Sequence, residues 1–523
     1  MDPSRTIYAL NKLIGKDSDK PITEIFTSLN VAVTVSEQSA TSENSQLILT
    51  FLSNLLFRLT PAIGLIDFLL PTNSVRSIPT LPKWKNTFLK ETLLNMFESI
   101  APTMKVRFNE NPLSAYSVVI VIGDKTPGNL VGKKQLFIGS DGWNASVSTE
   151  RPITTQTIAN PFGAYAAAIL ACSETFKLYL YQRQDIIKSI RVIPLKNKLE
   201  FSTFDYSVNN KKSTPDLPKA IELPNLTIVG CGAGGGAALF SLASLSDLKC
   251  NLVVIDSDKV VDTNLNRYIY ADNNDINQYK VNLVESLFGH QREITVKPFT
   301  GPFIEEKGNL RRENFEFVLA AVHTKEARKQ IQYETPKIIW DGAATERGEF
   351  KIWRIQFGKT QCMRCKHPTE NNPEWERAEG VSKITGLSPK AIFKKITNND
   401  FFTEDEIIRI RNFCAKEKLS FELPMEGQAF SDWERNNCGK MNIPQIKEEV
   451  PIPFAPVMSG VLLAGEIIKE HYFPDNVLSS QYWNSLLGTF NKHIKPVLCK
   501  PKENCPLCKD PAIINQYRRY WKA

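Results

Sequence analysis

The sequence lacks a continuous apolar run of roughly 18 residues, the length at which a membrane-spanning helix becomes a candidate. Its most apolar stretch, residues 46–70, is interrupted by Arg58, Pro61 and Asp67. We therefore expect a buried helix followed by a strand at this place, and no membrane association. A targeting segment is not recognisable either, so the protein is expected to be cytoplasmic.

Cysteine is sparse, with 10 residues in a chain of 523. This density is too low for a fold held by disulfides, which a reducing cytosol would also disfavour. The net charge is only +8, and this modest excess gives no argument for a nucleic-acid partner. Without low-complexity tracts, a chain of this length is expected to form two or three globular domains.

The most informative positive feature is a glycine-rich turn that follows an apolar strand at residues 226–229. A small-residue helix comes next, and then a second strand at residues 251–255 that ends in Asp256. Strand, glycine turn, helix, strand and acid in this order predict a nucleotide-binding βαβ unit. Such a turn lets main-chain N–H groups approach a phosphate, and Asp256 is placed to accept hydrogen bonds from a ribose. The loop glycines predicted to bind the nucleotide are Gly230, Gly232, Gly234 and Gly235.

A polar and basic cluster follows this acid. A dinucleotide dehydrogenase does not require such a cluster at this place. The cluster contains Asp258 and Asn264, and then Arg267 and Lys280. The guanidinium of Arg267 offers a planar fork of donors and the ammonium of Lys280 a point charge, and both suit phosphate oxygens. The cluster therefore predicts an enzyme that handles a triphosphate.

This segment resembles the adenylating family that includes ThiF, MoeB, HesA and the ubiquitin-activating enzymes. The family pattern is a glycine loop, an acid, Asn-Leu-x-Arg and a lysine. Here Asn264, Arg267 and Lys280 stand 8, 11 and 24 residues after Asp256, which matches the family spacing. The resemblance implies ATP at the glycine loop, with Arg267 and Lys280 on its phosphates. Tyr268 stands where the family usually has Gln.

One position departs from the family pattern after its fourth strand. The family carries a magnesium-binding aspartate there, whereas this chain has His323, five residues before Arg328. Neutral imidazole is a poor ligand for a hard cation. Magnesium is therefore expected on another acid, with Asp258, Asp262 and Asp341 as candidates, or in an unusual arrangement.

Two C-x-x-C pairs lie 140 residues apart, Cys362 with Cys365 and Cys505 with Cys508. Each pair can supply two thiolates, and together they would complete a tetrahedral four-sulfur zinc site. The alternatives are four unrelated buried thiols, or disulfides, which a reducing cytosol disfavours. The adenylating family carries a structural zinc at matching places, which favours the zinc site.

A further cysteine, Cys438, precedes an apolar helix predicted over residues 457–469. In the ThiF-type order a cysteine in this crossover loop can accept an activated acyl group or a sulfur. The resemblance thus makes Cys438 the candidate acyl acceptor, with Arg435 and Lys440 near enough to favour its thiolate. Cys414, on the apolar face of a predicted helix, is the rival acceptor. A surface cysteine without chemistry is the third interpretation.

The predicted fold class is α/β, with a Rossmann-like adenylation domain built on a mainly parallel sheet. A second, inactive Rossmann-like domain is expected before it, because the first half has a buried strand but no glycine-rich phosphate loop. This half resembles the inactive partner domain of ubiquitin-activating enzymes. The expected boundaries are 1–205 for the inactive domain, 206–219 for a polar linker, 220–365 and 439–523 for the active domain with its zinc site, and 366–438 for a helical insertion with the crossover loop.

The resemblance implies ATP-dependent activation of a small ubiquitin-like protein with a β-grasp fold. Adenylation of its C-terminal glycine would precede thioester formation on Cys438 and transfer to a conjugating-enzyme-like partner. Neither a fused conjugating domain nor a C-terminal diglycine is recognisable. The alternatives are a sulfur-carrier-protein adenylyltransferase for cofactor or tRNA thiolation, a nicotinamide-dependent oxidoreductase, or a non-catalytic scaffold. Family architecture suggests a bacterial system of the kind encoded in antiviral defence operons, and homodimer formation stays open.

Overall fold

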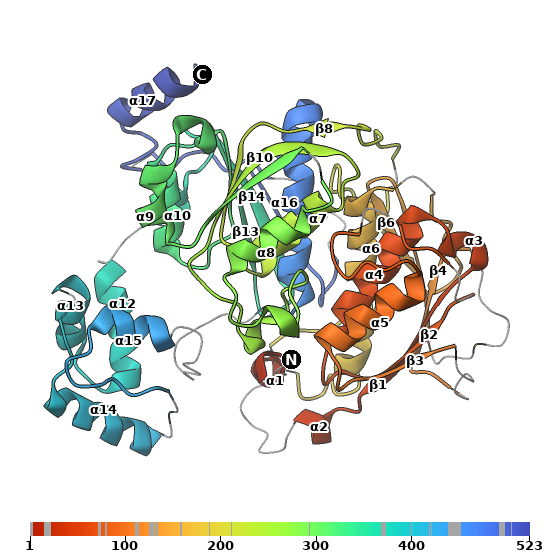
Figure 1. The fold of residues 1–523 in the computed structure, drawn as a ribbon, viewed down its shortest axis with the longest axis horizontal. Helices are drawn as coiled ribbons and strands as arrows, with labels where there is room; N and C mark the ends of the chain where they lie inside the picture. Colours follow the sequence, from red (N-terminus) through yellow and green to blue (C-terminus); the bar gives the residue numbers. More distant parts are fainter. Residues whose placement is uncertain are drawn as a thin grey trace. The chain divides into compact units, whose positions relative to one another are not determined.

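The computed structural model divides the chain into two compact units (Figure 1). The first comprises Met1–Cys365 and Val450–Ala523, and the second comprises Lys366–Glu449. Within the part of the chain that is described, no helix combines the length and apolar character needed to cross a membrane. The described residues are 4–14, 22–71, 75–78, 81–109, 115–124, 130, 134–156, 159–187, 189–210, 212–291, 293–367, 373–398, 400–417, 419, 421–437, 451–490, 497–503 and 505–522.

The amino-terminal half of the first unit is built on a seven-stranded sheet in the order β3-β2-β1-β4-β5-β6-β7. Its first five strands in this order run parallel, and β6 and β7 are added antiparallel. The central strand β4 is buried along its whole length, as expected for a parallel strand covered on both faces. The strands are β1 (Leu29–Val35), β2 (Ile63–Leu69), β3 (Lys105–Phe108), β4 (Val118–Ile122), β5 (Gln135–Asp141), β6 (Asn144–Ser148) and β7 (Lys198–Ser202).

The second half of this unit carries another sheet, in the order β11-β10-β9-β12-β13-β14-β15, with the short strand β8 paired to β10. Again the first five strands in this order are parallel and the last two are antiparallel. The strands are β8 (Ile221–Glu222), β9 (Leu226–Val229), β10 (Leu248–Ile255), β11 (Ile294–Phe299), β12 (Phe317–Ala320), β13 (Ile338–Ala344), β14 (Glu349–Ile355) and β15 (Gln481–Ser485).

The two seven-strand paths therefore have the same order and the same strand directions. This arrangement confirms the predicted fold class, a Rossmann-like α/β protein with two mainly parallel sheets. The first half keeps the sheet without the glycine loop: after β1 the chain enters the short helix α3 (Glu37–Ala40), which is capped by Ser36. The interpretation of this half as an inactive adenylation domain stays a prediction.

Helices from both halves lie next to one another (Figure 1), and their apolar side chains form one core. The ring of Phe51 in α4 stacks on Tyr165 of α6, with centroids 3.9 Å apart, and lies 5.8 Å from Phe240 of α7. The helix α16 packs against both α6 and α7. A side chain on Gly460 of α16 would overlap the main chain of Gly234, so these helices approach at backbone distance. The helices that form this core are α4 (Glu43–Phe57), α6 (Pro161–Tyr181), α7 (Ala233–Ala243) and α16 (Phe454–Tyr472).

The apolar stretch at residues 46–70 forms the buried helix α4 and then β2, as predicted. The other helices of this unit are α1 (Ser4–Ile14), α2 (Ile22–Ile25), α5 (Leu89–Ile100), α8 (Lys280–Leu287), α9 (Phe303–Glu306), α10 (Lys325–Tyr333), α11 (Met363–Lys366) and α17 (Pro511–Trp521), with 3-10 helices η1 (Asp262–Asn264), η2 (Asn273–Asp275), η3 (Lys307–Asn309), η4 (Arg312–Phe315) and η5 (Pro474–Asn476).

The second unit is helical, in agreement with the predicted insertion. Its helices are α12 (Pro373–Thr385), α13 (Pro389–Asn398), α14 (Glu404–Glu417) and α15 (Phe430–Asn437). They enclose a small core of their own that includes Ile384, Ile410 and Trp433. The start of α14 is fixed by a reciprocal cap, because the Glu406 N–H donates to Thr403 Oγ1 and the Thr403 N–H donates to Glu406 Oε2.

Candidate active site

The glycine loop between β9 and α7 is a backbone turn in which side chains would clash. Gly230 has φ +94°, and a Cβ there would lie 2.5 Å from the carbonyl oxygen of Ala321. A Cβ on Gly235 would overlap the carbonyl of Gly230. Gly232 is the residue before the first turn of α7, so the free N–H groups of that helix begin at the loop. The turn can thus present main-chain donors to an anion.

Asp256 stands at the end of β10 beside this loop. Its Oδ2 accepts a hydrogen bond of 2.6 Å from the Cys231 N–H, and its Oδ1 accepts one of 2.9 Å from the Asp258 N–H. Burial raises the pKa of the Asp256 carboxyl, although the nearby Lys280 charge opposes this shift. Asp256 therefore links the glycine loop to the acidic segment that follows β10.

Lys280, the first residue of α8, joins the same cluster although only 4% of its surface is exposed. Its Nζ lies 2.6 Å from Asp258 Oδ2 and 3.7 Å from Asp256 Oδ1. Burial alone would lower the pKa of Lys280, but the neighbouring Tyr268, Asp256 and Asp258 raise it above its ordinary value. The ammonium therefore stays charged, and the structure brings together three of the predicted site residues.

The segment around η1 holds Arg267 at the edge of this cluster. The Arg267 guanidinium donates to the Thr263 carbonyl at 3.1 Å and to Asn266 Oδ1 at 2.9 Å. Asn264 is buried, and its Oδ1 accepts from the Val261 N–H at 3.3 Å. The Asn264 amide oxygen is thus used within the loop, where it supports the position of Arg267.

The amino-terminal half clamps the segment that carries Arg267. Arg58, the residue directly after α4, is completely buried, and it donates to the carbonyl of Leu265 and, at 2.8 Å, to that of Ala271. Beside it, Asn54 Nδ2 donates to the Ile269 carbonyl at 2.8 Å. Arg58 and Asn54, which we call the clamp, thus bind main-chain carbonyls before and after Tyr268 and Tyr270.

Two further side chains extend this clamp. Lys83 Nζ donates to the Tyr270 carbonyl at 3.2 Å, and Trp84 Nε1 donates to Asp272 Oδ2 at 2.8 Å. Sequence reasoning missed all four clamp residues. It treated Arg58 only as a charge that interrupts an apolar run, although a charge within a buried apolar run is itself a signal of a specific partner.

The position of the family magnesium ligand holds no carboxylate. The His323 side chain is exposed, and its main-chain oxygen accepts from Arg328 at 3.3 Å. Arg328 Nε donates to Asp341 Oδ1 at 2.8 Å, and the Asp341 side chain is only 1% exposed. Two of the acids named as alternatives are therefore engaged, Asp258 by Lys280 and Asp341 by Arg328. The exposed His323 does not itself fit a magnesium ion, whereas Asp341 Oδ2 is buried without a hydrogen-bond partner in the described structure.

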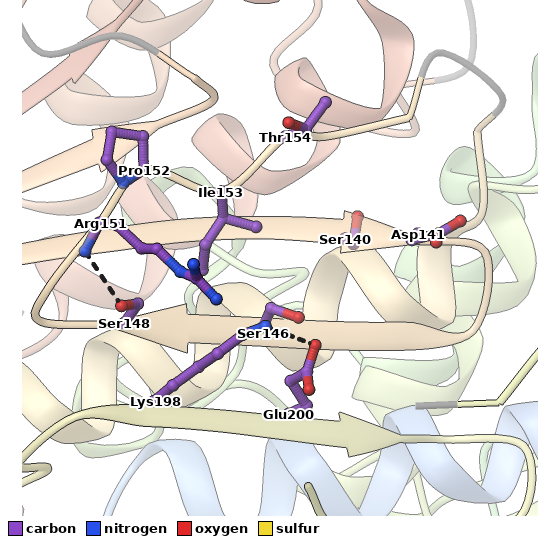
Figure 2. Close-up of a pocket in the computed structure, with 10 residues that line it drawn as sticks. All are labelled: Ser140, Asp141, Ser146, Ser148, Arg151, Pro152, Ile153, Thr154, Lys198 and Glu200. Carbon is purple, nitrogen blue, oxygen red and sulfur yellow. Dashed lines mark hydrogen bonds and ion pairs between the residues drawn. The ribbon is translucent and has the colours of Figure 1, made fainter. Parts of the chain in front are cut away.

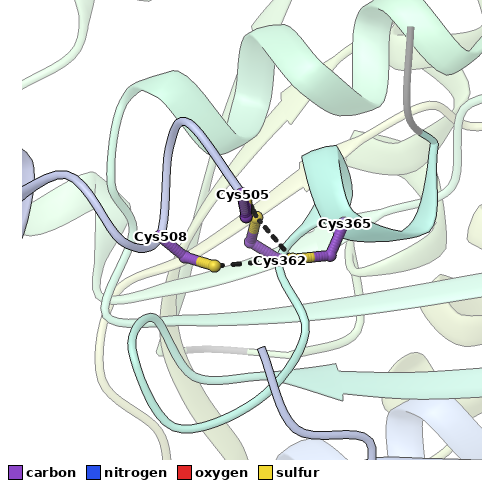
Figure 3. A group of neighbouring side chains, drawn as sticks. All are labelled: Cys362, Cys365, Cys505 and Cys508. Carbon is purple, nitrogen blue, oxygen red and sulfur yellow. Dashed lines mark hydrogen bonds between the residues drawn. The ribbon is translucent and has the colours of Figure 1, made fainter. Parts of the chain in front are cut away.

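The four predicted zinc ligands lie together, with all four sulfur atoms within 4.8 Å of one another (Figure 3). The Cys362–Cys365, Cys362–Cys505 and Cys365–Cys508 sulfur distances are 3.8, 3.6 and 3.4 Å. A tetrahedron with zinc–sulfur bonds of about 2.3 Å has edges of about 3.8 Å, whereas a disulfide is about 2.05 Å long. The buried cluster therefore fits a zinc ion.

Two local contacts favour the thiolate form of Cys365 and Cys362, although burial raises the pKa of the Cys365 thiol overall and the hydrogen bond with Cys362 raises the pKa of Cys508. The Lys502 N–H donates to Cys365 Sγ at 3.4 Å. A hydrogen bond from Cys508 is the main reason that the pKa of the Cys362 thiol is lowered to about 6. Thiolates are the form in which cysteine binds a metal.

A family model described as "ThiF family" matches residues 211–507, more than half of the chain. The chain belongs to the ThiF family. This confirms the resemblance based on the glycine loop and the Asn-Leu-x-Arg segment, and it supports the assignment as an adenylyltransferase that uses ATP. A second model, described as "Prokaryotic E2 family C", matches residues 34–180, where sequence reasoning had recognised no conjugating domain.

One relative in this comparison is an uncharacterized protein, y4jF, of Sinorhizobium fredii. It is 24% identical over 503 residues, which are 94% of this chain and 91% of the relative. Among solved structures, E. coli MccB with MccA-N7isoASN shares 14% identity at a TM-score of 0.32, over 55% of this chain and 67% of that one. E. coli MccB with ATP shares 13% at a TM-score of 0.30, over 55% and 66%.

The two candidate acceptor cysteines differ in what the structure says of them. Cys414 is 7% exposed in the core of the helical unit, and burial raises the pKa of its thiol. Its Sγ faces the Ile384 carbonyl at 3.9 Å. This burial fits the predicted buried helix face. Cys438 and Lys440 lie outside the described residues.

A cavity of about 200 Å³ lies in the amino-terminal half, on strands β5, β6 and β7 (Figure 2). Charges of both signs line it, and Lys198 pairs with Glu200 at 2.7 Å. Serine hydroxyls of β5 and β6 complete its wall. None of the residues predicted for the nucleotide site lines this cavity, which is therefore separate from the ThiF-type glycine loop.

Proposed function

We propose that this ThiF-family chain activates the C-terminal glycine of a ubiquitin-like β-grasp protein by ATP-dependent adenylation. The observation that carries the proposal is the cluster of Asp256, Asp258 and Lys280 beside the glycine loop, with Arg267 at its edge. It lies where the parallel strands β9 and β10 end, the usual ligand position in open α/β sheets.

In the proposed reaction, a carboxylate oxygen of the β-grasp protein attacks the α-phosphorus of ATP. The bond from that phosphorus to the bridging oxygen breaks, and pyrophosphate leaves with the electron pair. The chain contributes donors and positive charge: the loop N–H groups and the side chains of Arg267 and Lys280 neutralise the phosphates, and Asp256 accepts from the ribose. Magnesium would arrive with the triphosphate rather than on a carboxylate at position 323.

A second proposed step transfers the acyl group from the adenylate to the Cys438 thiolate and releases AMP. The resulting thioester would then pass to a conjugating-enzyme-like protein. The match to "Prokaryotic E2 family C" over residues 34–180 supports a link to ubiquitin-like transfer. The shared strand order of the two sheets supports the proposal that residues 1–205 form an inactive adenylation-like domain.

ATP–pyrophosphate exchange in the presence of candidate β-grasp proteins tests the first step. Lys280→Ala should lower the exchange rate by about 100-fold or more, because it removes a charge placed at the phosphates. Lys249→Ala is the matched control, since Lys249 lies on β10 in exposed ion pairs with Glu222 and Glu293. Equal exchange by wild type and Lys280→Ala, with unchanged melting temperatures, would remove the phosphate role of this lysine.

A non-reducing gel tests the second step, since a thioester with the modifier disappears when a thiol reductant is added. Cys438→Ala should abolish this band but keep pyrophosphate exchange, because adenylation does not use the thiol. Cys414→Ala should retain the band, since that thiol is buried in the helical core. A band lost with Cys414→Ala and kept with Cys438→Ala would move the acceptor role to the helical unit.

A further inference from the structure

The proposed nucleotide site contains a tyrosine, Tyr268, whose ring is packed on both sides while its hydroxyl makes no hydrogen bond within the described residues. Tyr268 is 5% exposed, and its ring centroid lies 5.4 Å from both the Arg267 guanidinium and the Lys280 ammonium. The ring stacks on Tyr270 at 5.9 Å with an interplanar angle of 14°. The Tyr270 hydroxyl in turn donates to the Cys231 carbonyl in the glycine loop. Tyr268 is therefore held between two cations and the loop.

The hydroxyl of Tyr268 points at the start of α7. A Cβ built on Gly232 would lie 3.6 Å from this oxygen, which places the hydroxyl beside the residue that precedes α7. Across the described residues, this hydroxyl makes no hydrogen bond. The main-chain N–H of Tyr268, in contrast, donates to the Asn264 carbonyl at 3.1 Å. A phenol O–H can donate a hydrogen bond to a phosphate oxygen.

We propose that Tyr268 is a nucleotide-binding residue whose hydroxyl donates to a phosphate oxygen of ATP at the start of α7. The inference rests on the proposed function, because it assigns a further donor to the same site. Two cations and the helix terminus attract the phosphate chain, and the phenol adds one further hydrogen-bond donor on a rigid ring. A residue with only two side-chain torsions loses little entropy when it makes this bond.

The arrangement explains how a tyrosine can occupy a position that lies between two phosphate-binding cations. Its ring face attracts both positive charges and its edge carries the donor toward the anion. Tyr268→Phe keeps the ring, its stack and both cation contacts, and removes only the hydroxyl. This variant isolates the hydrogen bond from the packing.

Binding of a non-hydrolysable ATP analogue to the full chain, followed by calorimetry, tests the proposal without a β-grasp partner. Tyr268→Phe should weaken binding by about 10- to 100-fold, the range of a hydrogen bond to a charged group. The melting temperature without nucleotide should not change. Tyr268→Gln, which restores a donor, should lose less affinity than Tyr268→Phe. Tyr279→Phe is the control, since Tyr279 precedes α8 and lies over Lys259 instead.

The outcomes separate this inference from the proposed function. If wild type binds the analogue and Tyr268→Phe binds it equally well, the inference is wrong and the nucleotide site stands. If wild type binds no analogue, both are overturned. A loss in Tyr268→Phe that is matched by a fall in melting temperature, with no recovery in Tyr268→Gln, would mean that the hydroxyl supports the fold instead.

Discussion

Burial of the Cys414 side chain should lower the reactivity of its thiol. Cys414 has a raised pKa because it is buried, so its thiolate is scarcer in the folded protein than in the unfolded chain at the same pH. With a folded pKa above the unfolded value, this group favours the fold below its ordinary pKa. That contribution is lost as the pH rises through the raised value.

Alkylation followed by peptide mass spectrometry tests this difference at pH 8. Cys414 should react more slowly in the native protein than in urea, because both access and thiolate fraction are reduced. Cys499, which is half-buried, serves as the internal control and should react faster than Cys414 in the native protein. Equal native rates at the two cysteines would contradict the buried position of Cys414.

Among single residues, those close together in sequence were predictable and the distant ones were not. The glycine loop, Asp256 and Lys280 follow one another through a strand–helix–strand unit, so their order alone indicated a nucleotide site. Arg58 lies 207 positions before Leu265, whose carbonyl it binds, and no local pattern connects the two. The position of the Tyr268 hydroxyl depends on the stacking of its ring on Tyr270, which the sequence order does not reveal.

At the scale of elements, the four-cysteine cluster fastens the carboxyl-terminal helix α17 to the second sheet. The Tyr517 hydroxyl donates to the Lys337 carbonyl, and Trp521 Nε1 donates to the Thr335 carbonyl, both at 2.9 Å. The Arg312 guanidinium lies over the rings of Tyr520 and Trp521 at 4.1 and 4.7 Å. These contacts follow directly after Cys508, so zinc binding and docking of α17 should be coupled.

Metal analysis of the purified protein should find about one zinc per chain. Cys505→Ser should remove most of this zinc and lower the melting temperature by several degrees, since metal binding and folding are coupled. Cys499→Ser is the matched control, because Cys499 lies near the cluster in sequence but outside it. A metal-free wild type with an unchanged melting temperature would rule out the zinc site.

Element boundaries were predictable wherever a cap marks them. The Thr403 and Glu406 pair indicates the start of α14, and Asn160 before Pro161 indicates that of α6, where Asn160 Oδ1 accepts from the Phe162 N–H. The apolar helix predicted over 457–469 extends to Phe454–Tyr472, since the prolines before it are tolerated in a first turn. The order in which the strands pair could not be predicted, because it depends on contacts between residues that are far apart in the sequence.

For the whole molecule, the clamp side chains of the amino-terminal half hold the segment that carries Arg267, a residue of the proposed nucleotide site. Arg58→Met should orphan the carbonyls of Leu265 and Ala271, at a cost of roughly 2–6 kcal/mol if each buried acceptor loses about 1–3. The variant should bind the ATP analogue more weakly, because the segment that carries Arg267 is released. Calorimetric unfolding and nucleotide titration measure the two effects.

Arg58→Lys keeps a charge and some of the donors, so its losses should be smaller than those of Arg58→Met. Arg183→Met serves as the control, because Arg183 pairs with Asp185 at the exposed end of α6 and should leave both measurements unchanged. Weaker stability without weaker nucleotide binding would limit Arg58 to holding the two halves together.

The two sheets with the same strand order belong to one polypeptide. This covalent link determines how nucleotide affinity depends on protein concentration. The clamp residues reach the Arg267 segment from within the same chain, at an effective concentration fixed by the connecting backbone. Two separate subunits would lose such a contact as their concentration fell below the dissociation constant. In this chain the clamp cannot diffuse away, so nucleotide affinity per molecule should stay constant from micromolar to nanomolar protein.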